Sequence, residues 1–305
     1  MTENKWDFLT KGDAYSYGFA SLSLQKQQEY YDDVASGALV LETIDKHPSE
    51  LTSKELDAYM FKNGLARFTT ESLTMDEAKE LIAKYKSYYL VGILPLEYLD
   101  NPEFMKYAIA HVRAITNRCF YHYASPRLRN EDYELASLAI RVQGSDAVYA
   151  LEGSEIIKNV DFVISEISKE RTYEEDGKII RSRSTEEYIA EAFLRSNPDL
   201  KNNIEVVQAA IKANPRCYSM LPPEMQDNPE IIKLTIESML ERGETSYVID
   251  YLKEHNRDPK IGKVIKTLSK VHDLKDGNKL QQGLAQSGMK HAAKQFKAAT
   301  ADKTK

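Results

Sequence analysis

Residues 94–109 read Leu-Pro-Leu-Glu-Tyr-Leu-Asp-Asn-Pro-Glu-Phe-Met-Lys-Tyr-Ala-Ile, and residues 221–236 repeat them as Leu-Pro-Pro-Glu-Met-Gln-Asp-Asn-Pro-Glu-Ile-Ile-Lys-Leu-Thr-Ile. The two stretches are identical at nine of 16 positions, at an offset of 127 residues. Weaker copies between them end at Ile140, Ile167 and Ile211, so the closing isoleucines lie 31, 27, 44 and 25 residues apart. Five copies in phase predict a repeat architecture.

Each copy has the signals of a helix start followed by an amphipathic helix. In Asp227-Asn228-Pro229-Glu230, either of the first two side chains can accept hydrogen bonds from the backbone N–H groups that open a helix. Proline fits the first helical position, and glutamate there favours the helix dipole. Ile232 and Ile236 follow four residues apart, on one helix face. We therefore expect helices to begin at Pro102 and Pro229, and the five closing isoleucines to be buried.

A unit of 25–31 residues is too small to bury its own apolar face, so neighbouring units must stack. This predicts an all-α, solenoid-like fold over residues 91–250. Residues 1–90 are expected to form a helical region, either a cap on the repeats or a small helical domain. Two capping boxes support helices there, Thr52-Ser-Lys-Glu55 and Thr74-Met-Asp-Glu77. Residues 1–20 are rich in aromatic side chains and are expected to be an arm that docks elsewhere.

The 44-residue interval contains an insertion. Residues 171–183 read as two short strands around Asp176-Gly177, a favoured hairpin turn, and Ser184-Thr-Glu-Glu187 reads as a capping box for the next helix. A hairpin inserted in one repeat projects from one edge of the array, where loops often bind partners. The candidate partner-binding residues are Tyr173, Glu174, Glu175 and Asp176. The alternative is a decoration without a role.

Charge is distributed unevenly. The chain carries −6, but residues 251–305 hold 13 Lys and Arg against 5 Asp and Glu, or +8, which leaves −14 for residues 1–250. Within this basic C-terminal segment, two lysine triplets recur at helical spacing and are candidate phosphate contacts: Lys263, Lys266 and Lys270, and then Lys290, Lys294 and Lys297. The alternative is a solvated lysine-rich helix or tail, because Arg is nearly absent from the segment and its aromatic content is low.

Composition excludes several classes of protein. Cys119 and Cys217 are the two cysteines, which excludes a disulfide framework and favours a reducing compartment. No run approaches 18 apolar residues, and the first residues lack the apolar core of a signal peptide. Gly and Pro together number 23, which is few for an all-β fold. We expect a cytoplasmic protein, or a component of a viral particle.

The sequence offers one candidate catalytic pair, in Cys119-Phe-Tyr-His122, which could place a thiol beside a base. Its neighbourhood recurs, however, because Arg118-Cys119-Phe120 reappears as Arg216-Cys217-Tyr218, and recurrence favours packing. The alignment of the copies places His122, Tyr149 and Phe193 at the position that Tyr218 occupies in the last copy. Nucleotide-binding, zinc-protease and serine-hydrolase motifs are absent from the sequence. We therefore predict no catalytic residues, no cofactor and no metal.

The Leu-Pro-x-Glu-x-x-Asp-Asn-Pro-Glu run with its Ile-rich helix resembles the short helical-repeat domains of unknown function that recur in phage, large-virus and intracellular bacterial proteins. The matching stretches are 91–109, 121–140, 149–167, 193–211 and 218–236, less than half of the chain. The middle copies depart from the pattern by lacking the proline. The resemblance implies a repeat fold. The expected function is a non-enzymatic protein–protein interaction or assembly module, with nucleic-acid contact through the basic C-terminal segment and a structural role in a virion as alternatives.

Overall fold

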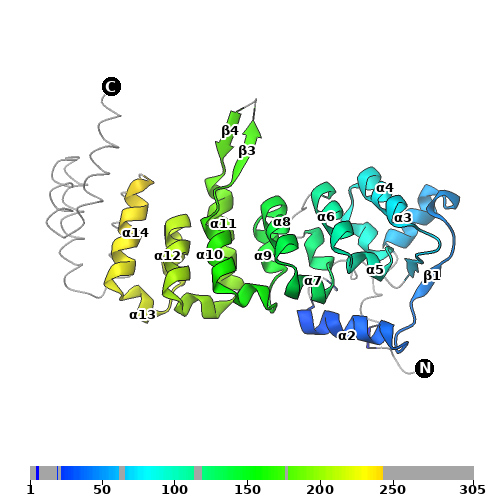
Figure 1. The fold of residues 1–305 in the computed structure, drawn as a ribbon, viewed down its shortest axis with the longest axis horizontal. Helices are drawn as coiled ribbons and strands as arrows, with labels where there is room; N and C mark the ends of the chain where they lie inside the picture. The colour runs from blue at the N-terminus through cyan, green and yellow to red at the C-terminus, as the bar shows by residue number, and fades with distance from the viewer. Residues whose placement is uncertain are drawn as a thin grey trace. The chain divides into compact units, whose positions relative to one another are not determined.

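The structure, a computed structural model, describes residues 5–6, 19, 22–61, 66–112, 119–175 and 178–242. These residues are mostly helical, which confirms the expected all-α class (Figure 1). The α-helices are α2 (Leu24–Ala35), α3 (Ser53–Phe61), α4 (Met75–Tyr85), α5 (Leu96–Leu99), α6 (Pro102–His111), α7 (Pro126–Glu131), α8 (Tyr133–Gln143), α9 (Ser145–Tyr149), α10 (Val160–Ser168), α11 (Arg183–Ser196), α12 (Ile204–Ala213), α13 (Pro223–Gln226) and α14 (Pro229–Glu241). Over the described ranges, no helix is both long and apolar enough to cross a membrane.

Short 3-10 helices connect many of these elements: η2 (Pro48–Glu50), η3 (Tyr88–Gly92), η4 (Phe120–Tyr123), η5 (Ile156–Lys158), η6 (Pro198–Asn202) and η7 (Pro215–Met220). The described residues fall into two compact units. One contains those up to Glu166 together with Arg195–Asn197, and the other contains Ile167–Leu194 and those from Pro198 onward. The predicted boundaries at residues 90 and 250 stay predictions.

The region before residue 90 is not purely helical, which corrects the expectation. Strands β1 (Glu42–Ile44) and β2 (Ala66–Phe68) pair in parallel, with Glu42 opposite Ala66. The Phe68 backbone N–H continues the pairing by donating to Ile93 O at 2.8 Å. Strands of three residues show no alternation that a sequence pattern could reveal. The helical parts were predicted correctly, because Thr52–Glu55 and Thr74–Glu77 both form reciprocal capping bonds.

Part of the aromatic N-terminal stretch docks as expected, on α2. Trp6 and Phe19 are each 2 % exposed, and both rings pack edge-on against Tyr30, with centroids 5.3 and 5.2 Å away. Trp6 also donates from Nε1 to the Asp33 carboxylate at 2.7 Å. The rings of Trp6 and Phe19 therefore pack on α2 through Tyr30.

A capped helix begins at the matching place in all five copies. Pro102 and Pro229 begin α6 and α14, as predicted. The proline is absent from the other three copies, yet their long helices begin at the matching place. The residue before each long helix is an Asn or Asp whose side chain accepts a backbone N–H of the first turn: Asn101, Asp132, Asn159, Asn203 and Asn228. Each cap lies eight residues before its closing isoleucine, so capping by Asn or Asp defines the repeat and proline does not.

Burial follows the same phase. The five closing isoleucines, Ile109, Ile140, Ile167, Ile211 and Ile236, are each at most 2 % exposed, which confirms their prediction as core. In four copies the residue before the isoleucine is a buried Ala or Thr: Ala108, Ala139, Ala210 and Thr235. The third copy departs from this pattern, because Glu166 occupies that place and is 1 % exposed. The sequence pattern gave no sign of a buried carboxylate there.

Long helices of successive copies lie side by side within each unit. In the first unit α6 packs between α4 and α8, and α8 also contacts α9 (Figure 1). In the second unit α12 packs against α14 and against the short helices on either side of it in sequence, η6 and η7. Helices of successive copies thus pack against one another within each unit.

The inserted hairpin is confirmed. Strands β3 (Thr172–Glu175) and β4 (Lys178–Arg181) pair antiparallel, with Tyr173 opposite Ile180, and extend beyond α11 (Figure 1). The predicted capping box at Ser184–Glu187 is wrong, because α11 begins at Arg183 and Ser184 lies inside it. The carboxylate of Glu186 instead accepts the Arg171 backbone N–H at 2.8 Å, which anchors the hairpin to the first turn of α11.

The repeat position assigned to His122 is also wrong. Tyr121 and Tyr218 both lie five residues before a proline-started short helix, both are fully buried, and each accepts the backbone N–H that closes its 3-10 turn. The second copy therefore has Tyr121 at this place. In the third copy Tyr149 is 40 % exposed and does not fill the position, whereas Phe193 is buried. Cys119 lies two residues before Tyr121, whereas Cys217 lies one residue before Tyr218. The sequence match that aligned the two cysteines therefore misaligned the two tyrosines by one residue.

Candidate functional site

Cys119 and His122 do meet, at the start of η4. Cys119 Sγ lies 3.2 Å from His122 Nδ1. The thiol is 1 % exposed, and burial raises its pKa to about 12. A thiol with so high a pKa stays protonated near neutral pH, although nucleophilic attack requires the thiolate. Cys217 is also fully buried, so both cysteines behave as small core residues.

A cavity of about 580 Å³ opens beside this pair; we call it the α2 cavity. Its wall combines the first turn of α2, the turn that follows α9, and single residues of η4 and α7. The lining residues are Leu22, Ser23, Leu24, Gln25, His122, Arg129, Tyr149, Ala150, Glu152 and Gly153. All of them belong to the first unit, and the volume is in the range of small-molecule sites.

Arg129 is the unusual residue of this wall. Its side chain is only 3 % exposed, and burial lowers its pKa to about 10, so that it remains charged at neutral pH. The guanidinium donates to Gln27 Oε1 and, at 3.3 Å, to Ala150 O, both of which are neutral acceptors. Gln27 is itself fixed by bonds of 3.0 Å to the carbonyls of Phe19 and Leu22. A short chain of buried polar groups therefore ties α7 to the start of α2.

The buried hydroxyls of Tyr31 and Tyr121 belong to groups whose pKa the charge of Arg129 affects. Burial raises the pKa of both Tyr31 and Tyr121, so neither hydroxyl ionises near neutral pH. The nearby positive charge of Arg129 acts in the opposite direction on both groups, but it is the smaller effect. In the part of the chain that the structure describes, the hydroxyls of Tyr31 and Tyr121 and the Nε of Arg129 have no hydrogen-bond partner. Such unsatisfied buried groups are costly and point to a functional or ligand-binding role.

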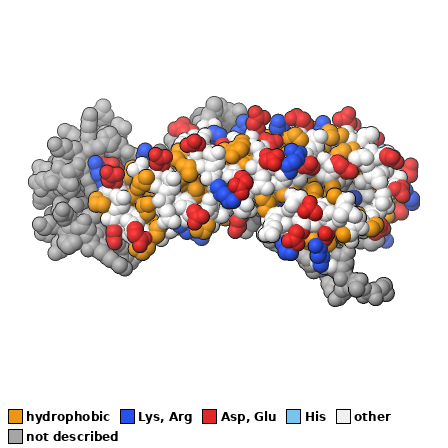
Figure 2. Space-filling view, turned by 60° about the horizontal axis from the view of Figure 1, so that its bottom comes forward, with side chains coloured by type: hydrophobic (Ala, Val, Ile, Leu, Met, Phe, Trp, Pro, Cys, Tyr) orange, Lys and Arg blue, Asp and Glu red, His pale blue; other side chains and the backbone are white. Residues whose placement is uncertain are grey.

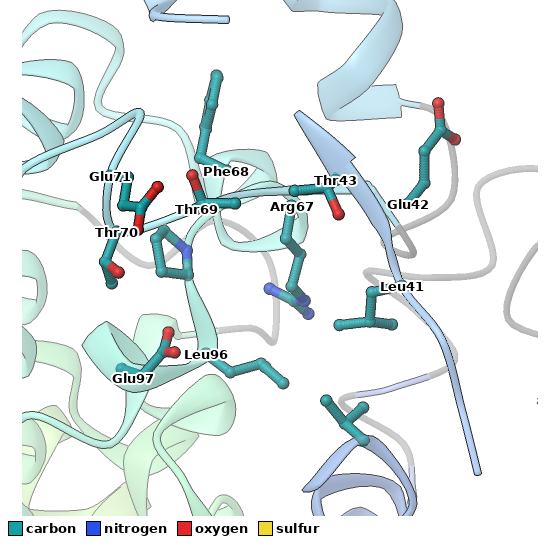
Figure 3. Close-up of a pocket in the computed structure, with 12 residues that line it drawn as sticks. Leu41, Glu42, Thr43, Arg67, Phe68, Thr69, Thr70, Glu71, Leu96 and Glu97 are labelled. Atoms are coloured by element: carbon teal, nitrogen blue, oxygen red, sulfur yellow. The ribbon is translucent and has the colours of Figure 1, made fainter. Parts of the chain in front are cut away.

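A second cavity, of about 440 Å³, lies beside β2 (Figure 3). Arg67 points into it between Leu41 and Leu96, with Thr69 and Glu97 nearby (Figure 3). Its guanidinium Nη1 donates to Leu94 O at 2.7 Å and to Val91 O at 3.0 Å. The charge therefore holds the η3 turn against β2, and this cavity offers less chemistry than the α2 cavity.

The predicted partner-binding residues lie on the hairpin. Tyr173, Glu174 and Glu175 belong to β3, and Asp176 lies outside the described residues. The six lysines predicted to contact phosphate, from Lys263 to Lys297, also lie outside them. Over the described ranges, no three His, Cys, Asp or Glu side chains gather as a metal site would require.

Sequence reasoning missed Arg129, Gln27 and the α2 cavity. Gln27 and Arg129 are 102 residues apart, and neither belongs to a motif. A lone arginine within a helical stretch reads as surface, because charged residues are mostly exposed. The one available hint is compositional: the segment Pro126–Glu131 places two arginines in a short helix, which leaves room for one on its inner face.

The comparisons with known proteins find no counterpart: no protein-family model, no curated protein and no solved structure matches the chain. The resemblance to helical-repeat domains of phage, virus and bacterial proteins therefore stays a prediction.

Proposed function

We propose that this chain is a non-enzymatic protein-binding or assembly module, built of helical repeats that stack as a solenoid. The observation that carries the proposal is the five-fold recurrence of one capped helix with one buried face. Repeats of this kind leave their outer faces free to vary, and proteins made of them commonly hold other macromolecules on extended surfaces. The resemblance to helical-repeat domains supports the same conclusion.

The surface of the repeats is suited to binding protein. Tyr133 and Tyr149 are each 40 % exposed and Tyr188 is 61 % exposed, although buried tyrosines are numerous elsewhere. Figure 2 shows hydrophobic side chains between charged ones of both signs on the face that it presents. Tyrosine offers a large contact area at low entropic cost, which is why interfaces are enriched in it. The hairpin adds a projecting element between the third and fourth copies.

The chemistry of the Cys119–His122 pair also favours binding over catalysis. Burial keeps the thiol protonated, and a protonated thiol is a poor nucleophile. We expect Cys119→Ala to leave the function in the host intact, apart from any loss of packing. If this change abolished function while folding and partner binding stayed normal, the protein would be an enzyme.

Affinity capture from the native host, with identification by mass spectrometry, tests the proposal. The full chain is expected to retain a defined protein partner with and without nuclease treatment. Double charge reversal of Glu174 and Glu175 to Lys should reduce this capture without unfolding the protein. The matched control reverses Glu224 and Asp227, two exposed residues of the second unit. If both double variants captured the partner equally well, the hairpin would not be part of the binding surface. If the full chain captured no reproducible partner, the proposal would be wrong.

Contact with nucleic acid is the second candidate, favoured by the charge of +8 on residues 251–305 against −14 on the rest. If it holds, deletion of residues 260–305 should abolish binding to single- or double-stranded nucleic acid. The affinity should also fall steeply between low and physiological salt. Absence of binding at low salt would exclude it.

A further inference from the structure

We propose that the α2 cavity binds a small organic anion through a phosphate or carboxylate group. The proposal concerns the first unit alone and is independent of the protein-binding function. Three features of the cavity carry it: a buried cation that donates only to neutral acceptors within the described residues, the open end of a helix, and a volume that suits a small molecule.

The buried cation is Arg129. Its two bonds, to Gln27 and Ala150, use two of the five N–H donors of a guanidinium. The groups whose charge acts on Arg129 are Tyr121, Tyr31 and Cys119, and burial raises the pKa of each of them, so all three are neutral at pH 7. Burial of a cation among neutral groups is costly, and a bound anion would relieve that cost.

The helix end is the N-terminus of α2, a helix of 12 residues. Ser23, Leu24 and Gln25 from its first turn line the cavity. The Ser23 side chain accepts the Lys26 N–H, which leaves the N–H groups of Leu24 and Gln25 without a partner within the helix. This first turn contains no acidic residue to neutralise the dipole. The positive end of the helix and the guanidinium of Arg129 thus meet at the same cavity.

The remaining polar groups of the wall also determine which ligands the cavity favours. His122 and Tyr149 add an imidazole and a phenol to the lining. Glu152 also lines the cavity and is the one carboxylate of its lining, but it is solvent-exposed, whereas Arg129 is buried. The positive charge therefore lies deeper than the negative one. A volume of about 580 Å³ exceeds that of an inorganic ion and leaves room for an organic body.

Titration calorimetry on the full chain tests the site with inorganic phosphate and with citrate, against sodium chloride at matched ionic strength. Binding of phosphate or citrate is expected, and the stronger of the two identifies the group that the site prefers. Arg129→Gln should weaken it about tenfold, since a charge-assisted bond is lost. The matched control, Arg141→Gln, removes an exposed charge in α8 and should change the affinity less than about twofold.

A second pair of variants guards against unfolding of Arg129→Gln. Gln25→Glu places a carboxylate in the first turn of α2, which should raise the melting temperature of the free protein while weakening anion binding about fivefold. Gln28→Glu adds the same charge on an exposed position of α2 outside the cavity wall, and it should weaken binding less than about twofold. No binding of phosphate or citrate by the unmodified chain at about 10 mM would overturn the proposal. Equal binding of chloride would also overturn the proposal. Equal losses of anion affinity in Gln25→Glu and Gln28→Glu would overturn it too.

Discussion

The two units differ in the side chain that bonds the C-terminal carbonyls of a repeat helix. In the first unit the C-terminal carbonyls of α6 are bonded by Gln143 of α8, whose Nε2 donates to Val112 O at 3.2 Å and to Ile109 O at 3.5 Å. In the second unit the C-terminal carbonyls of α12 are bonded by Arg242, just after α14, which donates to Ala213 O and, at 3.3 Å, to Lys212 O. The last carbonyls of a helix need such partners. We call these contacts the Gln143 link and the Arg242 link.

The difference lies in charge and burial. The Gln143 link is neutral and buried, and its Oε1 also accepts the Tyr121 N–H at 3.4 Å. The Arg242 link is ionic and partly exposed, because the guanidinium also pairs with the Glu187 carboxylate, whose side chain is 30 % exposed. The repeat therefore constrains the backbone geometry between successive helices, whereas the side chain that makes the link is free to differ. Stability of the two units should respond differently to salt.

The largest effect is expected at the core position that both units share. Ile140→Ala in α8 and Ile211→Ala in α12 each leave a cavity where a fully buried side chain packed. Each should lower the free energy of unfolding by about 2–5 kcal/mol. Chemical denaturation followed by circular dichroism measures this. A loss below about 1 kcal/mol at either site would mean that the repeat core is not shared.

A smaller loss is expected from Gln143→Leu, which keeps the volume but removes the donors and acceptor of the Gln143 link. The carbonyls of Val112 and Ile109 then lose this donor in a buried place. The free energy of unfolding should fall by about 1–3 kcal/mol. Because the link is neutral, the loss should be the same at low salt and at about 1 M salt. A strong salt dependence would contradict the contrast between the two links.

Arg242→Met is expected to cost about 1–2 kcal/mol at low salt, since it removes charge-assisted bonds at a partly exposed site. Denaturation at low salt and at about 1 M salt should show the loss shrinking as the pair with Glu187 is screened. A matched control, Lys233→Met, removes an exposed positive charge from α14 in the same unit. If both variants lost stability equally, the Arg242 link would have no special role.

The smallest effect concerns pH and separates the N-terminal region from the repeats. The Thr74 hydroxyl and backbone N–H, together with His47, hold the pKa of Glu77 down at about 2, below its ordinary value of 4.5. A lowered pKa stabilises the folded state above pH 4.5, and this contribution disappears as the pH falls from 4.5 towards 2. Melting temperatures should therefore fall less over this range in Glu77→Gln than in the unmodified chain. The amide cap Asn203 does not titrate, so Asn203→Ala should leave the pH profile unchanged.

The repeats could be predicted because the chain carries five copies, and their shared phase identified the helix starts and the buried isoleucines. The caps Asp132, Asn159 and Asn203 were already in the sequence, but the missing proline obscured them. Contacts between residues far apart in the chain could not be predicted, because no sequence pattern indicates them. Gln143 reaches carbonyls 31 and 34 residues away, Arg129 meets Gln27 across 102 residues, and β1 pairs with β2 through three residues each. Fold class followed from the pattern, whereas the α2 cavity depends on packing that no local pattern encodes.

Amide hydrogen exchange tests most directly whether five copies share one plan. The N–H groups of Phe104, Leu135, Phe162, Val206 and Glu230 each donate to the Asn or Asp cap of their helix. Such bonds should slow their exchange relative to the variant in which that cap is Ala, by a similar factor in all five copies. Equal slowing in α8, α10 and α12, which lack the proline, is the predicted result. Slowing confined to α6 and α14 would contradict the shared repeat.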